Sequence, residues 1–113
     1  MALEREWMRG AAPLAVLTLL DRREMYGYEL VEALERDSGG LLALGQSTVY
    51  PLLYNLEGRG DIEAVWREAP SGRRRKYYKA TSAGRARLER QRSQWKTLVA
   101  AMASLGVTEG TGE

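Results

Sequence analysis

The amino-acid sequence predicts a mostly α-helical domain with a small two-stranded β-hairpin and one long helix at its C-terminal end. Apolar residues recur at helical spacing in the first half of the chain, up to residue 58. Residues 61–80 alternate between apolar and polar and are interrupted by a turn, while the last third carries a seven-residue repeat. A chain of 113 residues is long enough for one such domain with an added helix. We expect a helical and hairpin unit over residues 1–80, a long helix over residues 81–106 and a flexible tail over residues 107–113.

The N-terminal third predicts a buried central helix followed by an amphipathic one. Residues 1–9 are charged, with a few apolar side chains, and suit a short helix that packs on a neighbour. Pro13 suits the first turn of the next segment, where its missing N–H has no helical partner. The run Leu14–Leu20 is apolar on every side, which predicts a helix buried in the core. A second helix begins near Gly27 and is stopped at Gly39 and the glycine after it.

A third helix carries the first group of candidate functional residues. Ser47 is the predicted N-cap, and the helix ends before the glycines near residue 60. Because Pro51 has no backbone N–H, we expect it in the first turn of this helix. The predicted buried stripe consists of Val49, Leu52, Leu53 and Leu56. The opposite, exposed face then presents Ser47, Thr48, Tyr50, Pro51, Tyr54 and Asn55.

The hairpin is predicted from two short alternating segments around a Pro–Gly turn. Ile62, Ala64 and Trp66 share one face of the first strand, and residues 76–80 form the return strand. Two strands alone are marginally stable, so the hairpin must pack against the helices. The aromatic rings of Trp66, Tyr77 and Tyr78 offer apolar surface for this contact.

The last helix is predicted to begin at Thr81 or Ser82 and to carry a heptad seam. A helix at the end of the chain has little core left to cover within one subunit, so its apolar stripe predicts a homodimer surface. The predicted interface residues are Leu88, Trp95, Leu98, Val99 and Met102.

Charge and composition narrow the class of function. The net charge is only +2, but the segment from Arg67 to Lys79 holds six cations against one acid, whereas residues 1–36 hold five cations against seven acids. Such focused positive charge is typical of polyanion binding, although a solvated surface loop has the same composition. The chain has neither Cys nor His and no glycine-rich phosphate loop, so we expect no enzyme activity, metal or cofactor. The longest apolar run, Ala11–Leu20, is too short to span a bilayer, so we expect a soluble cytoplasmic protein without membrane contact.

A polar-faced helix followed by a basic hairpin is the arrangement of a winged helix-turn-helix that binds double-stranded DNA. Phosphates are favoured at the N-terminus of the third helix, while Tyr and Asn further along can contact base edges. Tyr26 and Tyr28 either donate their hydroxyl groups to phosphates or bury their rings. The remaining candidate phosphate contacts are the hairpin cations Arg73, Arg74, Arg75 and Lys76, with the first two at the tip.

The segments "EMYGYELVEAL", "STVYPLLYNLE" and "GRRRKYYKATSAG", together with the late Trp95, resemble the PadR family of transcriptional regulators. The resemblance covers most of the chain, and its short C-terminal part is similar to the compact subfamily with a single dimerisation helix. It implies a homodimeric cytosolic winged-helix repressor, of a kind that often releases DNA on binding a small effector. The symmetry of such a dimer predicts an inverted-repeat operator. Trp95 then either packs the dimer or forms a wall for a planar apolar effector. The alternative function is a winged-helix module that binds protein partners without specific DNA binding.

Overall fold

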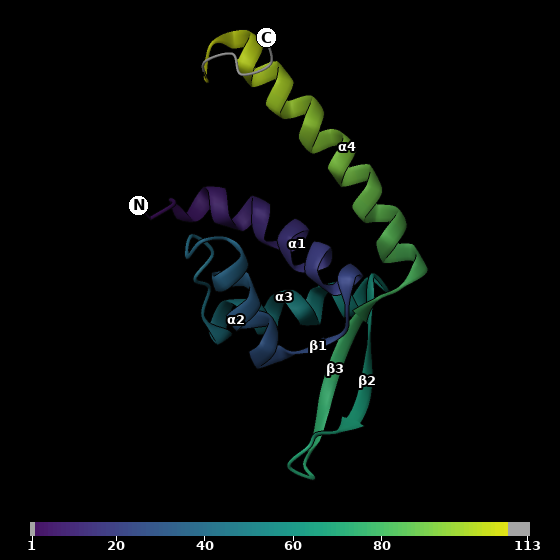
Figure 1. The fold of residues 1–113 in the computed structure, drawn as a ribbon. Helices are drawn as coiled ribbons and strands as arrows, with labels where there is room; N and C mark the ends of the chain where they lie inside the picture. The colour runs from purple at the N-terminus through teal and green to yellow at the C-terminus, as the bar shows by residue number, and fades with distance from the viewer. Residues whose placement is uncertain (1, 109–113) are drawn as a thin grey trace.

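The computed structural model describes residues 2–108 and confirms the mostly helical fold with a hairpin and a long last helix (Figure 1). Over these residues the sheet has a third, short strand that the sequence did not predict. Residues 109–113 of the predicted tail lie outside the described residues. The elements are α1 (Arg5–Arg22), β1 (Met25–Tyr26), α2 (Gly27–Asp37), α3 (Gln46–Gly58), β2 (Ile62–Glu68), β3 (Arg74–Ala80) and α4 (Ser82–Leu105).

One hydrophobic core holds α1, α2, α3, the base of the sheet and the start of α4 together. Val16 and Leu17 of α1 are almost completely buried at its centre, as the apolar run of this helix predicts. No helix in the described part of the chain is both long and apolar enough to span a membrane. The other fully buried large side chains are Leu20, Leu30, Leu34, Val49, Leu53, Ile62 and Leu88.

Helix α1 is one continuous helix, and the expected break before Pro13 is absent. Pro13 is the ninth residue of this helix, where its ring forfeits one backbone hydrogen bond. The buried apolar side chains that follow it hold the C-terminal half of α1 in the core, and this packing outweighs the local cost of the proline. The charged segment at residues 5–9 therefore extends the same helix beyond the core.

The sheet has the strand order β1-β3-β2, and both pairings are antiparallel. Tyr26 pairs with Tyr77 at one edge, and Ile62 pairs with Ala80 at the base of the hairpin. Tyr78 is buried against the helices, as predicted, but Trp66 is 56% exposed. The expectation for Trp66 is wrong because β2 runs outward past the end of the core, so only its first residues reach the helices (Figure 1).

The first turn of α4 is anchored on the loop between α3 and β2. The Thr81 side chain caps α4 by accepting a hydrogen bond from the Gly84 N–H at 3.0 Å, and its hydroxyl donates to the Gly60 carbonyl. The Arg87 Nε lies 2.8 Å from the buried Asp61 Oδ2, close enough for an ion pair but not aligned as a hydrogen bond. From this anchor α4 projects to one side of the molecule and the hairpin to the other (Figure 1).

Candidate nucleic-acid interface

Helix α3 begins two residues earlier than predicted, with Gly45 rather than Ser47 as its N-cap. The N–H groups of Thr48 and Val49 donate to the Gly45 carbonyl at 3.0 Å, and no side chain caps this end. The earlier start places Pro51 at the sixth helical position, beyond the first turn in which it was expected. Because Pro51 has no N–H, only the carbonyl of Ser47 loses its helical hydrogen-bond donor. Ser47 is exposed, so water can donate to that carbonyl instead. The first amides of α3 thus remain available to an anion.

One face of α3 is open to solvent along its whole length. Val49, Leu53 and Leu56 are buried, whereas Leu52, which was expected beside them, is only half-buried. Tyr54 is 77% exposed, which is unusual for a large aromatic residue with no partner to cover it. The exposed residues of this face include all six that were predicted, namely Ser47, Thr48, Tyr50, Pro51, Tyr54 and Asn55.

Tyr50 also fixes how α3 crosses α2. A Cβ atom at Gly27 would lie 2.4 Å from the Tyr50 Cε1 atom, so the ring occupies the space that any other side chain would fill. Gly27 is the first residue of α2, and the next residue, Tyr28, is exposed beside it. The helix-turn-helix pair is therefore held by a ring-to-backbone contact that leaves the edge of Tyr50 partly exposed.

The two cations at the hairpin tip are unpaired, whereas Arg67, Lys76 and Lys79 form ion pairs. Arg73 lies in the turn and is exposed, and the guanidinium of Arg74 lies 5.5 Å from the centre of the Trp66 ring. Neither arginine forms an ion pair with any residue from 2 to 108. Arg67, by contrast, is paired with Glu24. Within the hairpin, the positive charge that is free to meet a polyanion therefore lies mainly at the tip.

Arg75 and Lys76 point to opposite sides of the hairpin, as the alternation of a strand requires. The Arg75 guanidinium stacks on the Tyr26 ring at 4.4 Å, and this contact half-buries it. The Lys76 ammonium lies 3.4 Å from the carboxylate of Glu57, which is close to the end of α3. Burial acts to lower the pKa of Lys76, but Tyr78 and Glu57 outweigh it and the pKa is raised. Both cations thus contribute to the internal structure of the hairpin as well as to its charge.

Tyr26 and Tyr28 have different surroundings. Tyr26 lies in β1, half-buried, with its ring edge-on to Tyr77 at 5.5 Å between centres. Tyr28 is 49% exposed at the start of α2. Tyr26 therefore packs its ring within the sheet, whereas Tyr28 is open to solvent.

The predicted dimer stripe on α4 divides into a buried and an exposed part. Leu88 is fully buried in the core of its own chain and is not available to a second copy, which corrects its assignment to the interface. Trp95, Leu98 and Val99 are each about half exposed, and Met102 is half-buried. The correction arises because the first two turns of α4 pack on α1 before the two helices diverge (Figure 1).

Where α1 and α4 diverge, they border a groove of about 610 Å³. Trp7 of α1 is 65% exposed and lines this groove with Trp95 and Leu98 of α4. Trp7 was not among the predicted interface residues, although an aromatic residue in a charged helical segment was the available signal. Two tryptophans and a leucine are left partly open to solvent at this one groove, which is therefore an exposed apolar surface.

Comparison with known proteins agrees with this geometry. Residues 16–90 match the family described as "Transcriptional regulator PadR-like family". Transcriptional regulator Rv3488 of Mycobacterium tuberculosis is 35% identical over 88 residues, which cover 78% of this chain and 78% of that protein. A PadR family regulator from Eggerthella lenta has a crystal structure with a TM-score of 0.78 and 34% identity, covering 92% of this chain and 88% of its own. The crystal structure of a PadR-like regulator from Bacillus cereus gives a TM-score of 0.80 at 26% identity, with 92% and 99% covered.

Proposed function

Because this chain belongs to the PadR-like family of transcriptional regulators, we propose that it binds duplex DNA as a homodimer and represses transcription in the cytoplasm from an inverted-repeat operator. The observation that carries this proposal is the open face of α3 beside a hairpin whose tip cations are unpaired. In the proposed complex α3 enters the major groove, and the tip residues Arg73 and Arg74 contact phosphates.

The proposed roles on α3 follow from chemistry and position. Ser47 and Thr48, at the N-terminal end, are suited to a phosphate or to the first base edges. Asn55 can bond adenine in a bidentate manner, and the exposed ring of Tyr54 can contact a thymine methyl group. Tyr28 is placed to donate its hydroxyl to a neighbouring phosphate.

The proposed homodimer uses the open part of the α4 stripe. Trp95, Leu98 and Val99 are apolar and about half exposed, and covering them with a second copy would remove this surface from water. Twofold symmetry then predicts two recognition helices roughly 34 Å apart, one turn of DNA. A planar apolar effector in the groove between Trp7 and Trp95 would change the α4 contacts and release the DNA. Quenching of tryptophan fluorescence by naphthalene in a Trp66→Phe variant tests this pocket, and an unchanged Trp7 and Trp95 signal would contradict it.

Selection from random duplexes is the direct test of DNA recognition. We expect an enriched palindrome whose half-sites are one helical turn apart, bound with an affinity that falls steeply with salt. Arg73→Ala with Arg74→Ala should weaken binding to all duplexes alike and flatten the salt slope, with Arg90→Ala and Lys96→Ala on α4 as the matched control. Weak binding without sequence preference would instead favour a module that binds an acidic protein.

A further inference from the structure

We propose that Arg5 and Arg9 of α1 form a second phosphate clamp, at the end of α3 opposite the hairpin. This inference rests on the proposed function and adds a DNA contact from a helix outside the recognition helix and the hairpin. The two arginines are four residues apart, so they share one face of α1.

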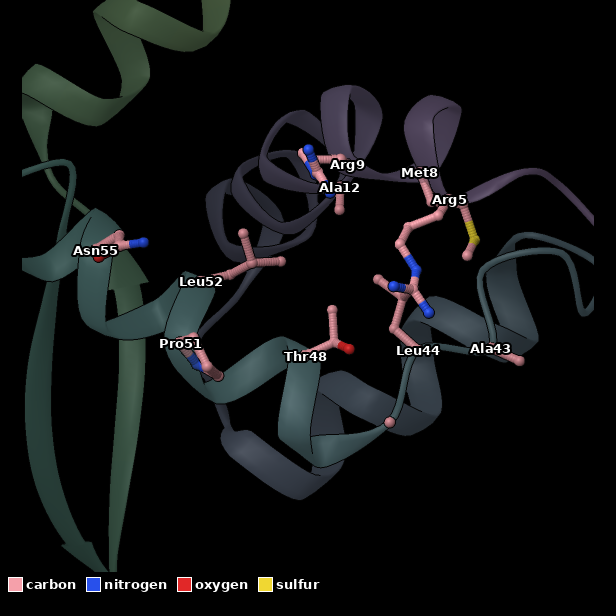
Figure 2. Close-up of a pocket in the computed structure, with 11 residues that line it drawn as sticks. Arg5, Met8, Arg9, Ala12, Ala43, Leu44, Thr48, Pro51, Leu52 and Asn55 are labelled. Carbon is pink, nitrogen blue, oxygen red and sulfur yellow. The ribbon is translucent and has the colours of Figure 1, made fainter.

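The clamp is built around a hollow of about 500 Å³ between α1 and α3 (Figure 2). Arg5 and Arg9 line it from α1, and Thr48, Pro51 and Asn55 line it from α3. The side chains of Met8 and Leu52 contribute apolar walls between them. Three of the residues proposed to face DNA therefore share one hollow with two arginines.

The charge in this hollow is unbalanced. Its lining includes no aspartate or glutamate, and neither Arg5 nor Arg9 forms an ion pair with any residue the structure describes. Glu6, the acid that lies between the two arginines in the sequence, lines the groove on the other side of the helix. Like charges one helical turn apart repel each other, and a bound anion relieves this repulsion. The hollow is therefore suited to a negatively charged partner.

The position of the hollow identifies that partner as the DNA backbone. In Figure 2 Asn55 lies at the end of α3 next to the strands, while Arg5 reaches into the hollow near Thr48 at the other end. Thr48 and Asn55 are seven residues apart, about 10 Å along the helix. This length is close to the ~12 Å width of the major groove, so cations beyond both ends of α3 suit the two phosphate strands that border the groove.

The test compares salt slopes on the duplex obtained by selection. Each lost phosphate contact lowers the slope of log affinity against log salt by about 0.9, so Arg5→Ala with Arg9→Ala should lower it by up to about 3.6 for two protomers. Arg5→Lys with Arg9→Lys keeps the charge and should retain most of the slope, and the Arg90→Ala and Lys96→Ala control should leave it unchanged. Circular dichroism of each variant verifies that it folds. We expect folding to be intact, because both arginines are exposed.

A scan with neutral methylphosphonates locates the contact. Wild-type protein should lose affinity when a phosphate on either side of the major groove is replaced by a methylphosphonate. The affinity of the Arg5 and Arg9 variant should be insensitive to such a replacement only on the side away from the hairpin. If the Arg73 and Arg74 variant flattens the slope but the Arg5 and Arg9 variant does not, the proposed function stands and this inference is overturned. Binding of inorganic phosphate in the hollow with an unchanged slope likewise overturns it. Wild-type protein that binds no duplex removes both proposals.

Discussion

Replacement of Gly84 by alanine tests how α4 is anchored to the rest of the domain. A Cβ atom at this position would lie 1.9 Å from the carbonyl oxygen of Asp61 and 2.8 Å from its carbonyl carbon. These are backbone atoms, and the same oxygen accepts a hydrogen bond from the Thr81 N–H at 3.0 Å. No rotation of a side chain can relieve the overlap, so either α4 or the start of β2 must move.

The expected loss of stability in Gly84→Ala follows from two opposing effects. Alanine is favoured over glycine in a helix by about 1 kcal/mol, whereas overpacking a filled site costs about 1–3 kcal/mol. Because the overlap at Gly84 is with rigid backbone, the upper end of this range applies and the free energy of unfolding should fall by about 2 kcal/mol. At roughly 4 °C per kcal/mol for a domain of this size, the Tm should fall by about 8 °C.

Urea unfolding, followed by circular dichroism at one protein concentration, measures this change. Gly58→Ala is the matched control, because Gly58 is also helical and a Cβ atom there would meet nothing within 4 Å. We expect Gly58→Ala to leave the protein as stable as the wild type or slightly more stable. A Gly84→Ala variant that unfolds at the wild-type urea concentration would refute the rigid anchor.

Three further predictions concern the ion pairs and the α4 surface. Arg87→Met should lower the free energy of unfolding by about 2 kcal/mol, because it removes the partner of the buried Asp61 carboxylate. This is less than the ~3–5 kcal/mol of a fully buried pair, since Arg87 is partly exposed. A smaller change in a urea titration would contradict a stabilising role for this contact. Leu98→Glu should shift the protein from dimer to monomer in light scattering, since it places a charge on the proposed interface. The hydrogen bond from Arg67 holds the pKa of Glu24 below its ordinary value of 4.5, so the stabilisation it gives is present above that value and is lost as the pH falls through the lowered pKa. Urea midpoints of wild type and Glu24→Gln should therefore differ at pH 7 and converge in strong acid, and equal midpoints at both would refute the effect.

The exposed face of α3 could be predicted because one periodic stripe determines the rotation of the whole helix. Once Val49, Leu53 and Leu56 are buried, the residues between them, apart from the half-buried Leu52, must face away from the core. The position of the helix start was less certain, since Ser47 is a good N-cap by chemistry but the chain turns into the helix at Gly45. Local side-chain pattern thus predicts which residues are exposed better than it predicts where the helix begins.

Residues whose environment depends on distant segments could not be assigned in this way. Leu88 and Trp95 occupy the same position of the seven-residue repeat, yet one is buried in the core and the other is half exposed. The difference depends on the angle at which α4 leaves α1, which no residue of the repeat encodes. The pairing of β1 with β3 and the contact between Lys76 and Glu57 likewise require the tertiary fold.

The angle at which α4 leaves α1 affects the geometry of the proposed dimer on DNA. Helix α4 is continuous from Ser82 to Leu105, a length of about 36 Å at 1.5 Å per residue. A tilt of about 10° at its first turn would therefore displace its far end by about 6 Å. If two copies join through α4, the same tilt changes the separation of their recognition helices by a comparable distance, about one sixth of the ~34 Å between half-sites. In the proposed complex the contacts of Asp61, Thr81 and Gly84 at this turn would therefore control operator spacing without touching DNA, and Gly84→Ala should shift the half-site spacing selected from random duplexes.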